Sequence, residues 1–130
     1  MRTPDPEAIV GAYVDAFNSE NLEALVATLS EDVEIASKRG PLVGRDAVRR
    51  WAKRRASGSL SQRLVLDGVR AEGRDAVAFL RRQWLWIENG ELADEEELAV
   101  VVGLDADGLI ARWHPFDDRS KALAAAGLDD

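Results

Sequence analysis

The spacing of apolar residues has a helical period in the first half of the chain and a strand period in the second half. Ile9, Tyr13 and Phe17 recur every four residues, which is typical of the buried stripe of an amphipathic helix. Asp5 provides an N-cap carboxylate, and Pro6 stands where the first helical residue would be. The pattern therefore predicts a first helix that begins at this proline.

The spacing of apolar positions, and the turn residues that interrupt it, predict the other elements in the same way. We expect a short helix from Asn21 through Leu29, a short strand from Val33 to Ser37, a helix from about Arg45 to Ala56, strands at Leu60 to Arg70, Ala76 to Glu88, Glu91 to Leu104 and Leu109 to Phe116, and a last helix from about Asp118 to Ala126. Helices come first and strands second. This order predicts an α+β fold with an antiparallel meander, in one domain that covers residues 1–130.

Composition narrows the chemistry that the chain can perform. The chain has 130 residues, of which 46% are hydrophobic, and this is enough for one core. It has no cysteine and a single histidine, His114, which excludes thiolate chemistry, cysteine-bound metals and two-histidine metal motifs. We expect neither a metal nor a bound organic cofactor.

Charge and hydropathy bear on partners and location. A net charge of −7 argues against nucleic acid and membrane surfaces as partners. A basic segment around residues 45–55 reads best as a solvated helix face. The first residues lack the apolar core of a signal peptide, and no apolar run approaches the ~18–20 residues that span a bilayer. We therefore expect a cytoplasmic protein.

The dipeptide Asn89-Gly90 predicts a hairpin with a two-residue turn. One face of that hairpin would then carry Val77, Phe79, Arg81, Gln83 and Leu85 with Glu96, Leu98, Val100 and Val102. This set has the longer aliphatic run, so we expect it on the concave, helix-covered face. A slip of one residue would put Arg82 and Trp84 there instead of Arg81 and Gln83.

Several short motifs along nearly the whole chain resemble one family. They are Tyr13-Val14-Asp15-Ala16-Phe17-Asn18, Leu29-Ser30-Glu31-Asp32-Val33, Gly44-Arg45-Asp46-Ala47-Val48 and Asp107-Gly108-Leu109-Ile110. Together with the order of elements, they resemble the SnoaL-like branch of the nuclear transport factor 2-like superfamily. The resemblance implies a cone-shaped, curved antiparallel sheet wrapped around the N-terminal helices, with an internal pocket. Relatives include ketosteroid isomerases, limonene-epoxide hydrolases, polyketide cyclases and non-catalytic binders, so the fold does not name an activity.

The resemblance also implies which residues line the pocket. Tyr13 matches a tyrosine of the ketosteroid isomerases, but Ser37 stands where their catalytic base falls, and residues 99–101 offer no counterpart of their aspartate. Arg81 and Gln83 stand where the epoxide hydrolases place an arginine and an aspartate, and a glutamine cannot act as that acid or base. The candidate pocket residues are Tyr13, Phe17, Ser37, Trp51, Arg81, Gln83 and Trp113.

Each of these candidates also has a structural reading. Tyr13 is equally at home in a helix core, and Arg81 could pair with Glu96 at the rim. The resemblance places Trp113 inward and His114 outward, and a lone histidine without a partner is more often a surface residue than an acid–base catalyst. The catalytic residues stay unknown.

Two functions remain open. The first is a protein with an apolar pocket for a small organic molecule that acts as a cofactor-free isomerase, cyclase or hydrolase. The second is a non-catalytic ligand-binding or dimerisation module. A carboxylate reaching the pocket from Asp117 or Glu96 would favour the enzyme. Because Trp84 and Trp86 fall on the other face of the hairpin, we also expect a homodimer that buries them.

Overall fold

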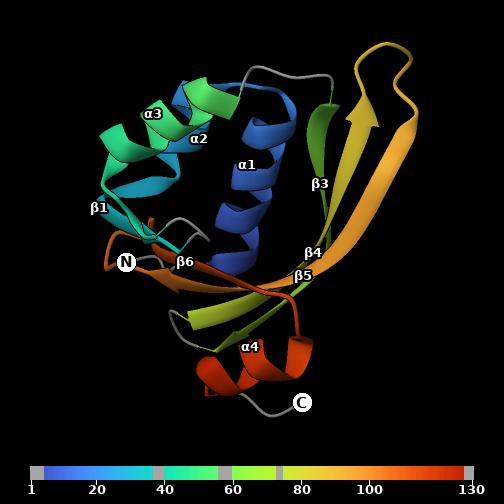
Figure 1. Ribbon diagram of the computed structural model, residues 1–130. Helices are drawn as coiled ribbons and strands as arrows, with labels where there is room; N and C mark the ends of the chain where they lie inside the picture. The colour runs from blue at the N-terminus through green and yellow to red at the C-terminus, as the bar shows by residue number, and fades with distance from the viewer. Residues whose placement is uncertain (1–4, 37–39, 56–59, 73–74, 128–130) are drawn as a thin grey trace.

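The computed structural model describes residues 5–36, 40–55, 60–72 and 75–127, which form one curved sheet with helices on both sides (Figure 1). The elements are α1 (Pro6–Asn18), α2 (Leu22–Ala27), β1 (Leu29–Ile35), β2 (Leu42–Val43), α3 (Arg45–Arg55), β3 (Leu60–Glu72), β4 (Asp75–Trp86), β5 (Leu92–Leu104), β6 (Ile110–Phe116) and α4 (Arg119–Ala125). This order confirms the expected α+β class. No helix in these ranges is long and apolar enough to cross a membrane.

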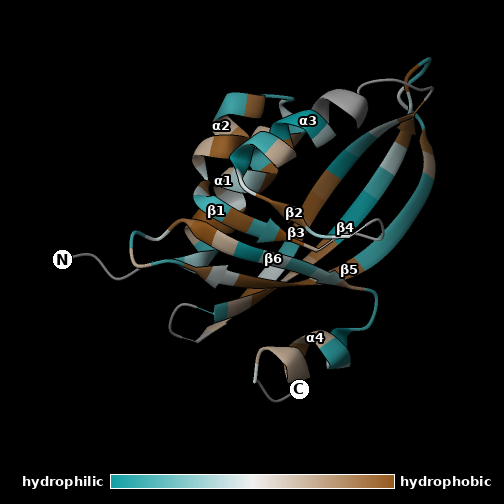
Figure 2. Ribbon diagram, turned by 60° about the vertical axis from the view of Figure 1, so that its left-hand side comes forward, coloured by the Kyte–Doolittle hydropathy of each residue, from teal (hydrophilic) through white to brown (hydrophobic). Residues whose placement is uncertain are grey.

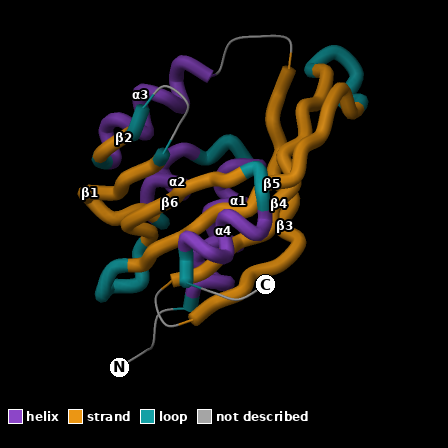
Figure 3. The backbone as a smooth tube through the Cα atoms, turned by 60° about the horizontal axis from the view of Figure 1, so that its bottom comes forward, coloured by secondary structure: helices purple, strands orange, loops and turns teal. Residues whose placement is uncertain are grey.

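The six strands are arranged in the order β2-β1-β6-β5-β4-β3 (Figure 3). Strands β3 to β6 form the expected antiparallel meander. The sheet is mixed rather than wholly antiparallel, because β1 pairs with β6 in the parallel sense. The meander's long strands extend beyond the helices and curve around α1, which gives the sheet its concave side (Figure 1).

Helix α1 begins as its sequence predicts. The Asp5 carboxylate accepts the backbone N–H groups of Glu7 and Ala8 at 3.1 and 3.3 Å, and Pro6 occupies the first helical position. In the expected apolar stripe, Tyr13 is buried at 5% exposure, and Ile9 and Phe17 are half-buried and pack against the same core. The helix therefore lies with one side against the sheet.

The boundary between α2 and β1 differs from the prediction. The helix ends at Ala27 instead of Leu29, and β1 begins at Leu29 instead of Val33. Leu29 pairs with Ile110 of β6, whose N–H donates to the carbonyl of Thr28 at 2.9 Å. This long-range ladder outweighs the local helical spacing of the leucines.

Two apolar cores lie on the two faces of the sheet. The larger core joins Tyr13 of α1 to Leu80 and Val100, and we call this concave side the inner face. The smaller core joins Val77 to Leu123 of α4, and we call this side the outer face. Figure 2 shows α4 on the opposite side of the sheet from α1, α2 and α3.

The β4–β5 hairpin has a longer turn than Asn89-Gly90 alone would give. The Trp86 N–H donates to the Glu91 carbonyl at 2.9 Å, so residues 87–90 form a four-residue loop. Gly90 has a φ of +72°, which glycine adopts without strain. This loop alone would shift the paired positions by two residues and leave every side chain on its expected face.

A bulge in β5 changes that outcome. Leu85 lies opposite Leu92 but Trp84 lies opposite Asp94, so the intervening Ala93 has no partner on β4. The net shift is one residue. Side chains of β5 keep their expected faces, and those of β4 exchange theirs, so the predicted register is wrong for β4.

Candidate functional site

Aromatic side chains from α1 and β6 meet on the inner face. The ring of Tyr13 lies 4.2 Å from that of Trp113 and 6.5 Å from that of Phe17, measured between centroids. Trp113 is buried, as the resemblance implied, whereas Phe17 is half-buried and packs against the edge of the inner core. Trp51 is half-buried on α3, one turn after the fully buried Val48. Tyr13 and Trp113 are therefore part of the packed inner core, and Phe17 and Trp51 are the partly exposed members of this aromatic set.

A charged pair borders the inner apolar surface. Arg82 follows Leu80 on the inner side of β4, and Glu96 lies directly opposite it on β5. Their Nη1 and Oε1 atoms are 3.4 Å apart. The Arg82 guanidinium carbon also lies 5.7 Å from the centroid of the Trp84 ring, within cation–π range. A donor, an acceptor and an aromatic ring therefore stand together beside the apolar surface.

Arg81 and Gln83, the polar residues expected on the concave face, lie on the outer face instead. The β5 bulge is the cause, because it turns the odd-numbered residues of β4 outward. Arg81 binds Asp67, the extra residue of a bulge in β3, through Nε at 3.0 and 3.2 Å and Nη2 at 3.0 Å. Gln83 donates to Glu95 at 2.7 Å. The alternative pairing of Arg81 with Glu96 is also wrong, since Glu96 pairs with Arg82.

The Asp67 hydrogen bonds also stabilise the charged form of Arg81. They raise the pKa of its guanidinium above the usual value, with a smaller contribution from the charges of Asp67, Glu95 and Glu97. Asp67, Glu95 and Glu97 thus place three carboxylates around Arg81 on the outer face.

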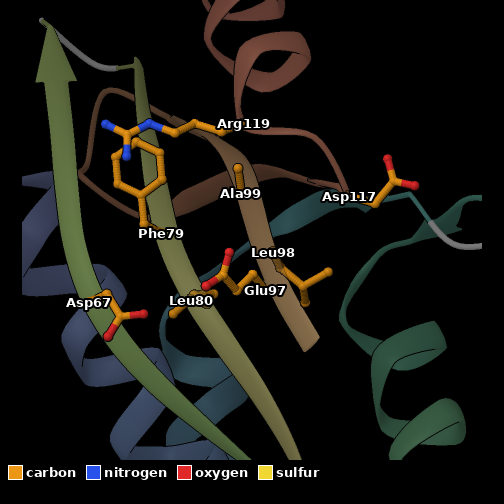
Figure 4. Close-up of a pocket in the computed structure, with 8 residues that line it drawn as sticks. All are labelled: Asp67, Phe79, Leu80, Glu97, Leu98, Ala99, Asp117 and Arg119. Carbon is orange, nitrogen blue, oxygen red and sulfur yellow. The ribbon is translucent and has the colours of Figure 1, made fainter. Parts of the chain in front are cut away.

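A pocket of about 200 Å³ lies on the outer face, beside α4 (Figure 4). It is lined by Asp67, Phe79, Leu80, Glu97, Leu98, Ala99, Asp117 and Arg119. The Arg119 guanidinium lies over the Phe79 ring at 4.4 Å, and the carboxylates of Asp67 and Glu97 lie farther along the strands from α4. Nothing in the sequence signalled this pocket, because Phe79 and Arg119 are forty positions apart.

The remaining candidates take the following places. Ser37 lies outside the described residues. His114 is exposed on the outer side of β6, where its ring stacks on Phe116 at 4.4 Å. Asp118 caps α4, and Asp117 lines the outer pocket. Among the described residues, no group of three histidine, cysteine, aspartate or glutamate side chains is placed to hold a metal ion.

Trp84 and Trp86 are not on the outer face, which corrects the basis of the expected dimer. Their even positions on β4 place them on the same side as Arg82. Trp84 is half-buried, whereas Trp86 is exposed at the free end of the strand. It belongs to an exposed group at the strand ends, which we call the apolar tip: Leu60, Trp86, Ile87 and Leu92.

Comparison with solved structures supports the fold. A protein from Xanthomonas campestris pv. campestris that is described as a polyketide cyclase is 23% identical to this chain. The match covers 91% of this chain and 93% of that chain, with a TM-score of 0.69. A Δ5-3-ketosteroid isomerase from Mycobacterium sp. is 14% identical, with 88% and 93% covered and a TM-score of 0.70. TerC, co-crystallised with polyporic acid, is 17% identical, with 92% and 95% covered and a TM-score of 0.73.

The sequence itself matches a family model. Among curated proteins, none matches the chain. The model of the SnoaL-like domain, however, matches residues 10–113, which run from the first turn of α1 to Trp113 of β6. The matched part thus includes the inner-face aromatic residues and the Arg82–Glu96 pair. The chain belongs to the SnoaL-like domain family, within the nuclear transport factor 2-like superfamily.

Proposed function

We propose that this protein binds a small, mostly apolar organic molecule on the inner face, between α1 and strands β3 to β5. The observation that carries the proposal is the partly exposed apolar surface beside the inner core, with Phe17 on α1, bordered by the Arg82–Glu96 pair. Leu66 and Leu98 extend this surface, since both are half-buried and pack against the inner core. Apolar surface that a ligand covers contributes roughly 25 cal/mol per Å² to the free energy of binding.

Two activities are compatible with such a site. The first is a cofactor-free isomerase, cyclase or hydrolase, and the second is a non-catalytic binder. The names of the ketosteroid isomerase and polyketide cyclase relatives support the first as an analogy of fold. Glu96 supports it on chemical grounds, because a carboxylate beside an apolar surface can exchange protons with a bound substrate.

The test of binding is a fluorescence titration with N-phenyl-1-naphthylamine, a neutral probe that brightens in apolar surroundings. We expect saturable binding that Leu66→Trp abolishes, because the larger ring would fill the inner surface, and Leu66 does not line the outer pocket. Phe79→Trp is the matched control on the outer face, where it alters the outer pocket. Loss of binding in the Phe79 variant alone would move the site to the outer pocket and contradict the proposal.

We also propose that the protein forms a homodimer through the apolar tip. Its four large apolar side chains are exposed by 40–61% at one end of the sheet, where Leu60 pairs with Trp86 and Leu92 lies opposite Leu85. A monomer gains by covering exposed apolar side chains of this size.

A further inference from the structure

Arg81 and Arg82 are adjacent on β4, but their guanidinium groups are engaged to different degrees. Arg81 makes three contacts of 3.0–3.2 Å with Asp67. Arg82 makes one ion-pair contact, 3.4 Å to Glu96, within the described part of the chain. That distance exceeds the 2.7–2.9 Å usual for a charge-assisted hydrogen bond. Most of the five N–H donors of Arg82 are therefore available to another acceptor.

The position of Arg82 is also distinctive. In the described residues of β3 to β6, the register sends the arginines at 63, 70, 81 and 112 to the outer face. Arg82 alone carries a positive charge on the inner side of these strands. It lies one inner position beyond the buried Leu80, at the border of the apolar surface.

We propose that Arg82 selects ligands that carry an oxyanion, such as a carboxylate, phenolate or enolate oxygen, attached to a flat apolar body. This inference rests on the inner-face binding proposed above. The oxyanion takes the place of Glu96 on the guanidinium, while the apolar body covers the half-buried Phe17, Leu66 and Leu98 of the inner face. The planar guanidinium matches an oxyanion with two donors at once, and the Trp84 ring beside it holds its orientation.

Glu96 gives way readily because its bond to Arg82 is weak. The two side chains are 45% and 33% exposed, so water screens their attraction. In the free protein, Glu96 neutralises Arg82 and limits the cost of leaving a cation beside the apolar surface. When a ligand binds, the Glu96 carboxylate leaves the guanidinium and stays beside the bound molecule. Glu96 is thus a competitor of the ligand for the same guanidinium.

The experiment compares two probes that share one aromatic body. N-phenyl-1-naphthylamine is neutral, and 1-anilinonaphthalene-8-sulfonate adds an oxyanion to the same skeleton. We expect Arg82→Gln to weaken binding of the sulfonate by about tenfold, the loss of one charge-assisted contact, and to change binding of the neutral probe by less than about twofold. Arg81→Gln is the matched control, since it removes the adjacent charge from the outer face.

A second variant keeps the inference testable if Arg82→Gln does not fold, which its thermal unfolding curve would reveal. Glu96→Gln removes the competing carboxylate, and we expect it to tighten sulfonate binding by about threefold. An unchanged sulfonate affinity in either folded variant, or an equal loss in Arg81→Gln, would overturn the inference. Failure of the neutral probe to bind would instead show that the proposed apolar site itself is wrong.

Discussion

At the scale of single residues, Asn18 has a structural role that its sequence context does not reveal. Its side-chain amide donates to the Leu64 carbonyl at 2.8 Å, and its Oδ1 accepts the Leu64 N–H at 2.8 Å. The side chain thus satisfies both backbone groups of one residue of β3, as a neighbouring strand would. In the sequence, Asn18 only marks the end of the first helix. The tie between α1 and β3 fixes one wall of the inner face.

We expect Asn18→Ala to lower the free energy of unfolding by about 1–3 kcal/mol, because it leaves the Leu64 N–H and carbonyl without partners. Urea unfolding followed by circular dichroism measures this change. Asn89→Ala is the control, since its side chain accepts one exposed N–H, from Glu91, in the hairpin loop. Equal losses in the two variants would contradict the structural role of Asn18.

Tyr13 also leads to a prediction about chemistry. The residues that match the ketosteroid isomerase positions include Tyr13 but provide Ser37 in place of the base and buried aliphatic residues at 99–101. Loss of one oxyanion donor costs on the order of 10²–10³ in rate, and loss of the base removes the proton acceptor. We therefore expect negligible turnover of a 5-ene-3-ketosteroid, followed by the absorbance of the conjugated enone. Robust turnover that Tyr13→Phe abolishes would refute this expectation.

At the scale of elements, the β4–β5 hairpin shows how one residue decides a site. The alternation of β4 is evident in the sequence, and its longer aliphatic run favours placing Arg81 and Gln83, rather than Arg82 and Trp84, on the concave face. The register depends on the loop of residues 87–90 and on the unpaired Ala93. A bulge has no strong local signal, so the sequence could not place it.

The register can be tested by cross-linking, because the chain has no cysteine of its own. We expect the double variant Arg82→Cys with Glu96→Cys to form a disulfide under mild oxidation, since the two residues are opposite each other and on one face. Gln83→Cys with Glu96→Cys should stay reduced, because these side chains point to opposite faces. Mass spectrometry with and without reductant distinguishes the two. Oxidation of the second variant alone would restore the register expected from a two-residue turn.

At the scale of the whole molecule, the apolar tip exposes four large apolar side chains to water. We expect light scattering to give the mass of a dimer and Trp86→Glu to shift it toward the monomer, because a charge at the tip opposes its burial. Val43→Glu is the control, since Val43 is 60% exposed on β2, a strand at the opposite edge of the sheet from β3. A monomeric mass for the unmodified protein would rule out this interface.

The sequence by itself determined the class of the fold, most element boundaries and the family. Those features rest on local signals: the four-residue spacing in α1, its Asp5 cap, the two-residue period of the strands and the Asp118 cap of α4. Each signal is complete within about a dozen residues. Short-range hydrogen bonding and the burial of one face therefore suffice to specify these elements.

The tertiary structure decided what depends on partners far apart in the chain. The parallel pairing of Leu29 with Ile110 ended α2 early, and the Ala93 bulge put Arg82 rather than Arg81 on the inner face. A pleated strand presents its two faces by alternation, so a shift of one residue exchanges them completely. The free energy that selects between the two registers comes from packing against α1 and α4, which no local stretch of sequence contains.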